Sequence, residues 1–349
     1  MSNDVKEKIK LNRLFDNRTK NRDADFTFID LFAGIGGIRL GFEVHNGKCV
    51  FSSEFDKFAQ ETYKENFDEI PHGDITEIHE EEIPEFDYLL AGFPCQPFSH
   101  AGLKKGFEDD RGTLFFDIAR IVNHHHPSVL FLENVKGFKN HDKGRTFKIV
   151  KFILEKLGYE VHARVLNAKH FGVPQNRERI YIIAFLGETD FSFPEPPKHE
   201  TRVGQILENK VPEKYTISEK LWSGHKRRKK ENEAKGWGFG YSMFDEDSEY
   251  TSTMSARYYK DGSEILIKQE DKNPRKITPR EAARLQGYPE NFQIPVSDTQ
   301  AYKQFGNSVA IPVIEAIAAE VVKAHKKMNP RKGNKINIEE IELEEALKE

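Results

Sequence analysis

The chain of 349 residues has only two cysteines, Cys49 and Cys95, and neither belongs to a Cys-x-x-Cys pair. This scarcity argues against a disulfide framework and against a cysteine-based zinc site, and it is typical of proteins from reducing compartments. No apolar run approaches the ~18–20 residues that cross a membrane. Residues 1–25 are charged and lack the apolar segment of a signal peptide. We expect a cytoplasmic protein without membrane contact that starts with a flexible leader.

The chain also lacks a strong charge of either sign. The 53 Lys and Arg face 57 Asp and Glu, and the last eleven residues, Glu339 to Glu349, alone hold six Glu and one Lys. Nucleic-acid binding cannot be inferred from this average charge. We expect residues 326–349 to form a charged, solvated tail.

Short apolar runs alternate with longer amphipathic ones between Phe26 and Leu186. Continuous apolar strands separated by helices predict an α/β fold with a mostly parallel sheet. The expected strands are 26–31, 49–54, a short one ending at Asp74, 86–92, 128–134, 160–168 and 179–186. The expected helices are one from about Ile38, then 55–67, 113–126 and 144–158, with Gly158 as the C-terminal cap of the last.

The character of the sequence changes after Gly187. Residues 188–303 are rich in Pro, Lys, Glu, Ser and Gly up to about residue 275, where no helical period persists. This predicts a smaller, irregular, β-containing domain. A helix is expected at 277–287, where Thr278 and Glu281 can form a capping box. A last amphipathic helix at 309–325 should return to the first domain, which we assign to 26–187 plus 304–325.

Unusual residues follow the carboxyl ends of the expected strands, the edge where parallel sheets bind ligands. The Gly-rich loop at 32–37 is not a Gly-x-Gly-x-x-Gly motif, because Arg39 stands at the third position. This disfavours a pyrophosphate site and a nicotinamide oxidoreductase, but the loop still allows close approach of a ligand. Glu54 has the spacing of a ribose ligand, and Asp74 suits an adenine amino group. A nucleoside without phosphates, S-adenosylmethionine, fits best; the alternative is an ordinary turn with two surface acids.

Cys95 follows Pro94 at a strand end and precedes a polar loop, which predicts an exposed thiol rather than a small buried side chain. Arg177 and Arg179 can supply the positive charge that a nucleophilic thiolate needs. Glu133 ends an apolar strand, where partial desolvation favours a raised pKa and proton donation; the alternative is a helix cap. No metal site is predicted, since the consecutive His124, His125 and His126 would diverge on a helix.

Taken together, these motifs resemble the DNA cytosine-5 methyltransferase family over roughly residues 26–325. The resemblance lies in the segments FAGIGG, SSEFD, GDI, GFPCQPFS, ENV, QNRERI, RKITPREAARLQGYP and YKQFGNSV. It implies a Rossmann-like, mostly parallel methyltransferase sheet that binds S-adenosylmethionine, and a small target-recognition domain at 188–303.

The resemblance also implies a role for individual residues. Cys95 resembles the nucleophile, Glu133 the residue that contacts cytosine N3 and N4, and Arg179 the contact to O2, with Arg177 beside it. The expected cofactor residues are Phe32, Ala33, Gly34, Gly36, Gly37, Glu54, Phe55, Asp74, Ile75, Pro94, Leu114, Asn307, Ser308 and Val309. The expected DNA contacts are Gln96 and Ser99 next to the nucleophile, Lys229 and Lys230 on phosphates, and Thr251, Thr253 and Arg257 in the recognition domain.

The implied reaction is methyl transfer to C5 of a cytosine in a short specific duplex, through base flipping and a covalent Cys95–C6 intermediate. The closest likeness is to bacterial restriction–modification enzymes, with CCGG-like sites as a weaker suggestion. A cognate endonuclease acting on the same site and a monomeric state are also expected. The alternatives are a tRNA cytosine-5 methyltransferase on the same fold and a DNA-binding module without catalysis. For the run 226–230, a solvated charged face is the alternative to phosphate contacts.

Overall fold

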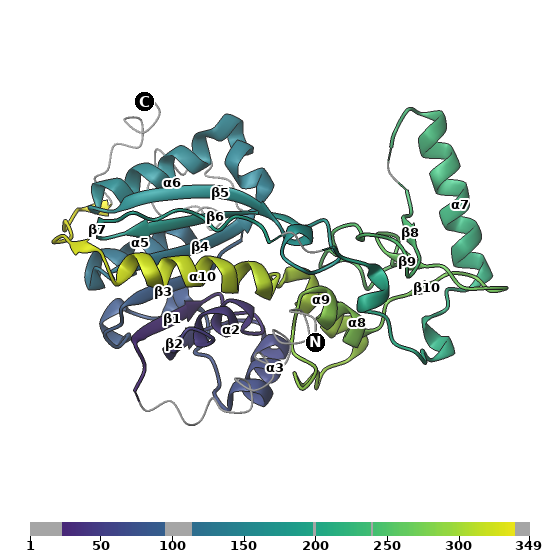
Figure 1. The fold of residues 1–349 in the computed structure, drawn as a ribbon, viewed down its shortest axis with the longest axis horizontal. Coiled ribbons are helices and arrows are strands. Elements are labelled where there is room, and N and C mark those ends of the chain that lie inside the picture. The colour runs from purple at the N-terminus through teal and green to yellow at the C-terminus, as the bar shows by residue number, and fades with distance from the viewer. Residues whose placement is uncertain (1–22, 95–113, 198–199, 239, 339–349) are drawn as a thin grey trace.

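The computed structural model describes residues 23–94, 114–197, 200–238 and 240–338 (Figure 1). Its largest part is a six-stranded sheet in the order β2-β1-β3-β4-β6-β5. The strands are β1 (Phe26–Leu31), β2 (Gly47–Ser53), β3 (Tyr88–Gly92), β4 (Val129–Val135), β5 (Glu160–Asn167) and β6 (Glu178–Phe185). The first four pair in parallel, while β6 runs antiparallel to both of its neighbours. The prediction of a mostly parallel α/β sheet is confirmed.

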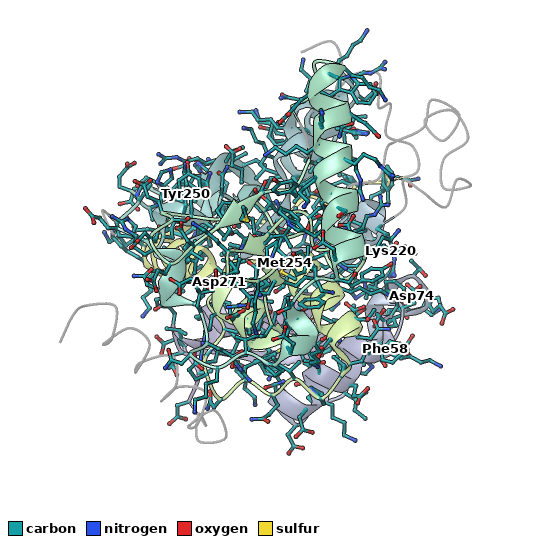
Figure 2. The ribbon with its side chains drawn as sticks, turned by 90° about the vertical axis from the view of Figure 1, so that its right-hand side faces the viewer. Phe58, Asp74, Lys220, Tyr250, Met254 and Asp271 are labelled. Carbon is teal, nitrogen blue, oxygen red and sulfur yellow. The ribbon has the colours of Figure 1, made fainter. Side chains whose placement is uncertain are left out.

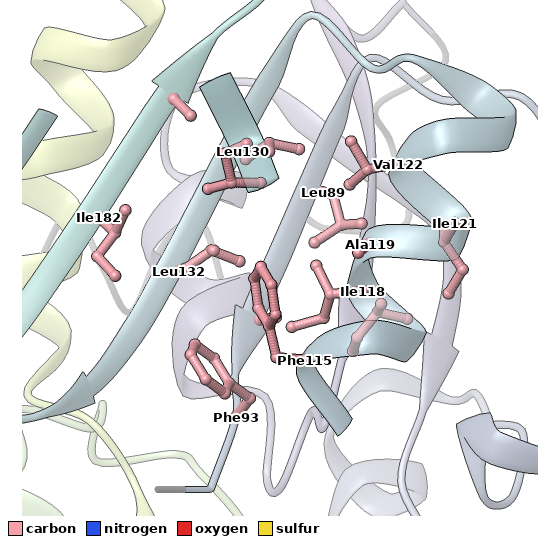
Figure 3. Close-up of a cluster of buried hydrophobic side chains, with 14 of the residues drawn as sticks. Leu89, Phe93, Phe115, Ile118, Ala119, Ile121, Val122, Leu130, Leu132 and Ile182 are labelled. Carbon is pink, nitrogen blue, oxygen red and sulfur yellow. The ribbon is translucent and has the colours of Figure 1, made fainter. Parts of the chain in front are cut away.

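Helices cover both faces of this sheet because its strands are apolar on both sides. On one face, α5 (Leu114–His125) and α6 (Arg145–Lys156) bury their apolar stripes against the sheet. Figure 3 shows Phe115 and Ile118 of α5 packed against Leu89 and Leu132 of the strands. On the other face lie α2 (Gly37–Glu43) and α10 (Ile311–His325). Gly158, with a φ of +99°, follows the end of α6 as expected.

One predicted strand is absent from the described residues. His72 makes only an isolated bridge to Ser53, and Asp74 caps a short 3-10 turn at Ile75–Glu77. The chain between the end of α3 (Lys57–Phe67) and β3 is therefore irregular rather than a strand ending at Asp74. In the GDI segment, Asp74 caps this turn with its side chain instead of pairing with a neighbouring strand.

Among the described residues, the region between the large sheet and α10 contains a three-stranded sheet in the order β10-β9-β8 and three α-helices. These elements are α7 (Glu219–Ala234), β8 (Met243–Phe244), β9 (Leu266–Ile267), β10 (Arg275–Lys276), α8 (Pro279–Leu285) and α9 (Asp298–Asn307). Thr278 and Glu281 form the predicted capping box at the start of α8. Apolar residues of this region, α8 and α9 share a third core that also contacts the Gly-rich loop and α3.

The expectation that no helix persists between 188 and 275 was wrong. The helix α7 spans 16 residues and starts after Ser218, whose hydroxyl accepts a hydrogen bond from the Leu221 backbone. The helix buries only His225 and Asn232, so its sequence has no apolar periodicity from which a helix could be predicted. In Figure 1 it stands at the far right, away from the large sheet.

The expected domain limits also differ from the structure. The short β7 (Gly187–Glu188) pairs with β11 (Asn329–Pro330), and Phe191 and Phe193 pack with the core of the large body. Contacts with this body therefore continue beyond 188, as far as Glu195, which pairs with Arg164 of β5. Ile336 and Ile338 pack against the sheet core, so residues 326–338 run along the body, although most of them are exposed.

One described stretch, Asp298–His325, is long and apolar enough by composition to cross a membrane. This differs from the expectation that no apolar run approaches that length. The stretch consists of α9 and α10, and most of it is buried inside the protein. Its apolar residues are used by the second and third cores, which is the pattern of a buried core helix.

Candidate active site

Glu133 and Arg179 meet at the carboxyl edge of the large sheet. In the ladder, Gly92 of β3 lies opposite Glu133, and Val135 of β4 lies opposite Arg179 of β6. Residues two apart on a strand share a face, so Arg179 is diagonal to Glu133 on the same side of the sheet. Their Nε and Oε1 atoms are 3.1 Å apart.

Glu133 is 8% exposed, and its Oε1 accepts no hydrogen bond from the described residues even though Arg179 is close. Burial raises the pKa of Glu133, and the charges of Arg179 and then Arg177 offset part of that rise. A carboxyl group with a raised pKa and an unused oxygen can hold a proton and share it with a ligand atom. This agrees with the desolvated environment expected from the sequence.

Asn134, the next residue, fixes the start of the cysteine loop. Its Nδ2 donates to the carbonyl of Phe93 at 2.9 Å, and its Oδ1 accepts from the backbone of Val135. Phe93 precedes the exposed Pro94, at which the described chain stops. Cys95, Gln96 and Ser99 lie outside the described residues. The segment leading to Cys95 is thus held one strand away from Glu133.

The Gly-rich loop after β1 needs its glycines for two different reasons. Phe32, Gly34 and Gly36 have φ values of +54°, +55° and +78°. A Cβ on Gly34 would meet no atom within 4 Å, which leaves open space above the backbone there. A Cβ on Gly36 would instead collide with Phe67, and one on Gly37 with Tyr288, Ser308 and Val309. Gly34 is the place where a ligand can approach, while Gly36 and Gly37 allow packing.

Glu54 connects this loop to the end of β2. Its Oε2 accepts from the backbone N–H of Gly34 and its Oε1 from that of Asp56, both at 2.8 Å. Burial raises its pKa, and these backbone bonds offset part of the rise. The adjacent Phe55 is 73% exposed, so its ring can cover a flat ligand held by the carboxylate.

The Asp74 turn lies beside Glu54. The backbone of Glu54 donates to His72, and Ser53 donates its hydroxyl proton to the carbonyl of Gly73. Asp74 is exposed and binds Thr76 through one carboxylate oxygen, while Ile75 is buried. Arg120 of α5 holds the turn by donating to the Ile75 carbonyl at 2.7 Å.

Residues 307–309 lie behind the Gly-rich loop. A Cβ added to Gly37 would lie 2.9 Å from side-chain atoms of Ser308 and Val309. The hydroxyls of Tyr288 and Ser308 are 2.6 Å apart. Asn307 is exposed at the end of α9, and Leu114 is half-buried at the start of α5. The contacts described above join the Gly-rich loop to Glu54, Ser308 and Val309, and the Asp74 turn to the end of β2.

Arg177 does not project freely toward this edge. It is 2% exposed, and its guanidinium donates to the backbone carbonyls of Met254, Gly306 and Ser308. Burial, and then the charge of Arg179, lower its pKa to about 9, which leaves it charged at pH 7. The guanidinium of Arg177 thus binds carbonyls, while Cys95, whose thiolate it was expected to support with its charge, lies outside the described residues. No sequence signal could have identified those acceptors.

The predicted DNA contacts differ in their exposure. Thr251 is fully buried and donates to the carbonyl of Pro174, so its side chain faces the protein. Thr253 is partly exposed and Arg257 exposed. Lys229 lies over the ring of Tyr241 at 4.6 Å, and Lys230 is exposed. Figure 2 looks onto this side of the molecule, with α7 upright and Met254 and Tyr250 labelled.

The chain is similar to known proteins along most of its length. A family model described as C-5 cytosine-specific DNA methylase matches residues 26–323. The Type II methyltransferase M1.ScrFI of Lactococcus lactis subsp. cremoris is 62% identical over 319 residues, which are 90% of this chain and 81% of that protein. The Type II methyltransferase M.NlaX of Neisseria lactamica is 60% identical over 311 residues, which are 88% of this chain and 99% of that protein.

Solved structures give the same fold at low sequence identity. The S. pombe Dnmt2 methyltransferase has a TM-score of 0.71 and 21% identity, covering 85% of this chain and 99% of that chain. A putative DNA modification methyltransferase encoded within an E. coli prophage has a TM-score of 0.66 and 22% identity, covering 86% and 100%. At these identities the likeness concerns the fold alone.

Proposed function

Because the chain belongs to the C-5 cytosine-specific DNA methylase family, we propose that it methylates C5 of a cytosine within a short specific DNA duplex, with S-adenosylmethionine as the methyl donor. It is a DNA methyltransferase of the restriction–modification type, like its Type II relatives. The observation that carries the proposal is the buried Glu133–Arg179 pair, which lies one strand from the segment leading to Cys95.

The chemistry explains this set of residues. C5 of cytosine is a poor nucleophile until a group adds to C6. The Cys95 thiolate forms a bond to C6, and the electron pair displaced from the ring double bond makes C5 enamine-like. Glu133, whose pKa is raised by burial, donates a proton to N3 and stabilises the charge pushed into the ring. Arg179 contacts O2 of the same cytosine.

The remaining steps restore the aromatic ring. C5 forms a bond to the methyl group as the bond between that methyl and the donor's sulfonium sulfur breaks, and the electron pair of the broken bond stays on the sulfur. A base then removes the C5 proton, and the returning electron pair expels the Cys95 thiolate. The cytosine must leave the duplex to reach Glu133 at the buried sheet edge. This costs a few kcal/mol of unstacking, which contacts in the pocket offset.

The residues at the neighbouring edge fit a nucleoside cofactor. The open space above Gly34, the Glu54 carboxylate and the exposed ring of Phe55 suit a ribose and a base. S-adenosylmethionine, when bound, supplies an electrophilic methyl group. Glu54 would hold the ribose, and the Asp74 turn with Ile75 the adenine. The other expected residues, Pro94, Leu114 and 307–309, would line the same pocket.

The region expected at 188–303, apart from its first residues on the large body, is proposed to recognise the DNA. The partly exposed Thr253 and the exposed Arg257 are candidates for base contacts, with Thr251 supporting them from inside. Lys229 and Lys230 on α7 are candidates for phosphate contacts, which add affinity without sequence preference. We further propose that the enzyme acts as a monomer alongside a cognate endonuclease.

The tRNA alternative is not favoured, because the relatives that share 62% and 60% identity with this chain are named Type II methyltransferases. The test is bisulfite sequencing of DNA from cells that express the protein, with a Cys95→Ala control. We expect complete methylation of one short sequence motif with the wild type and none with the control. Methylation of tRNA but not DNA by the purified protein would overturn the proposal.

A further inference from the structure

A short linking segment before β6 is buried between two parts of the molecule that have different proposed tasks. Residues 174–177 lie between the recognition segment 251–256 and the segment 305–308. Both contacts consist of hydrogen bonds that join residues far apart in sequence. The segment leads directly into Arg179 at the proposed catalytic edge.

Arg177 provides the first set of these bonds. Its Nη1 donates to the Met254 carbonyl at 3.0 Å, and its Nη2 donates to the carbonyls of Gly306, at 3.0 Å, and Ser308. All three acceptors are backbone atoms, so one side chain fixes the paths of two separate segments. A carbonyl left without this donor would be buried and unsatisfied.

Gln175 provides the second set and is fully buried. Its Oε1 accepts from the Met254 backbone at 3.1 Å, and its Nε2 donates to the Leu285 carbonyl and to Gln286. Gln286 in turn donates to the carbonyl of Phe305 at 2.7 Å. The side-chain amides of Gln175 and Gln286 therefore form a second hydrogen-bonded link between the segments 251–256 and 305–308, in addition to the link through Arg177.

The segments 251–256 and 305–308 also contact each other directly. A Cβ added to Gly306 would lie 2.4 Å from backbone atoms of Ser255 and Ala256. Neither segment can shift along this contact unless the other moves with it. On the far side, Ser308 and Val309 press on Gly37 of the Gly-rich loop.

We infer that Arg177 and Gln175 are positioning residues that couple DNA recognition to cofactor binding through the joined segments 251–256 and 306–309. Order imposed on 251–256 by DNA is transmitted to 306–309, which lie behind the proposed cofactor loop, and the reverse also holds. By linkage, each ligand then tightens the other by the same factor. The inference rests on the proposed function, because it takes DNA and S-adenosylmethionine as the two ligands.

The test measures the dissociation constant of a duplex containing the mapped methylation site, with and without saturating S-adenosylhomocysteine. We expect the wild type to bind the duplex at least about fivefold more tightly with the cofactor product, the lower end of typical coupling. Arg177→Gln should bring this ratio close to one, and Arg177→Lys should recover part of it. Gln175→Glu, which has nearly the same shape but loses the amide donor, tests the same connection with a smaller change.

Arg275→Gln is the matched control. Arg275 is also a buried arginine, but its ion pair with Glu281 lies inside the recognition region. This variant should lose thermal stability yet keep the wild-type coupling ratio. If Arg177 only stabilised the fold, Arg177→Gln and Arg275→Gln would instead affect the ratio alike. A wild-type ratio of one, or an unchanged ratio in folded Arg177→Lys and Gln175→Glu, overturns the inference. Failure of the wild type to bind either ligand instead overturns the proposed function.

Discussion

Two buried glutamates, each beside an arginine, differ in hydrogen bonding between the catalytic region and the recognition region. In the recognition region, Glu281 is 0% exposed and accepts from both terminal nitrogens of Arg275 at 2.7 and 2.8 Å. It also accepts from the backbones of Thr278 and Glu208, at 2.8 Å each. Every lone pair that the carboxylate can use in this geometry has a donor.

Glu133, at the edge of the large sheet, is almost as buried but is much less satisfied. Its Oε1 lies near Arg179 without an aligned hydrogen bond. Buried polar groups are normally hydrogen-bonded, and exceptions point to strain or to a role with an absent partner. Glu133 therefore keeps hydrogen-bonding capacity for a ligand, whereas the hydrogen bonds of Glu281 are all used inside the protein.

The largest expected effect comes from replacing Glu133. Glu133→Gln removes the proton donor but nearly preserves the shape, so methyl transfer should slow by about 10²–10⁴-fold, with little change in thermal stability. Glu281→Gln should do the opposite, because breaking a buried ion pair costs about 3–5 kcal/mol. Its activity per folded molecule should stay near that of the wild type. Single-turnover rates and thermal unfolding of both variants, measured side by side, check this contrast. Equal losses of rate in the two variants would remove the distinction.

A smaller effect is expected at Glu54. Glu54→Ala leaves the backbones of Gly34 and Asp56 without their acceptor, and it should weaken binding of S-adenosylmethionine by about 1–3 kcal/mol. Glu54→Gln keeps an acceptor oxygen and should lose less. Titration calorimetry measures both variants. An unchanged dissociation constant for Glu54→Ala would mean that the cofactor does not use this carboxylate.

The sequence predicted the catalytic region better than the recognition region, for a physical reason. Strands such as Phe26–Leu31 and Val129–Val135 bury both faces, so their composition identifies them, and motif residues at their ends follow from the sheet rule. The helix α7 has no apolar face to reveal it. The partners of Arg177 are carbonyls up to 131 positions away, and every residue type carries a carbonyl. The supporting role of Thr251 was hidden for the same reason.

Within the recognition region, two pairs of residues should affect binding differently. Lys229→Gln with Lys230→Gln should weaken DNA binding for all sequences alike and lower the salt slope by up to about 2. Changes at Thr253 and Arg257 should alter which cytosines are methylated. Lys148→Gln, an exposed position on α6, is the control and should change neither property. Affinity at several salt concentrations and genome-wide methylation maps test both parts. If the lysine variants rewrite the map while the Thr253 and Arg257 variants do not, the assignment is reversed.

The smallest effect concerns Asp30 of β1, a fully buried carboxylate of the catalytic region. Neither of its oxygens has a hydrogen bond among the described residues, and burial raises its pKa well above the ordinary value. The folded protein then holds a proton that the unfolded chain releases near pH 4, so this group lowers stability as pH rises from there toward the folded pKa. The wild type should therefore lose stability relative to Asp30→Asn as the pH rises from about 4 to 8. Parallel pH profiles for unfolding would contradict this.

The most direct test of the account uses a duplex in which 5-fluorocytosine replaces the target cytosine. After methyl transfer, fluorine stands where the C5 proton would be removed, so the Cys95 thiolate cannot be expelled. With S-adenosylmethionine present, the wild type should form a covalent protein–DNA adduct that survives denaturing electrophoresis. Cys95→Ser should form none, and Glu133→Gln should form it slowly. A wild type that methylates ordinary duplex but leaves no adduct, or an equal adduct with Cys95→Ser, would contradict the proposed Cys95–C6 intermediate.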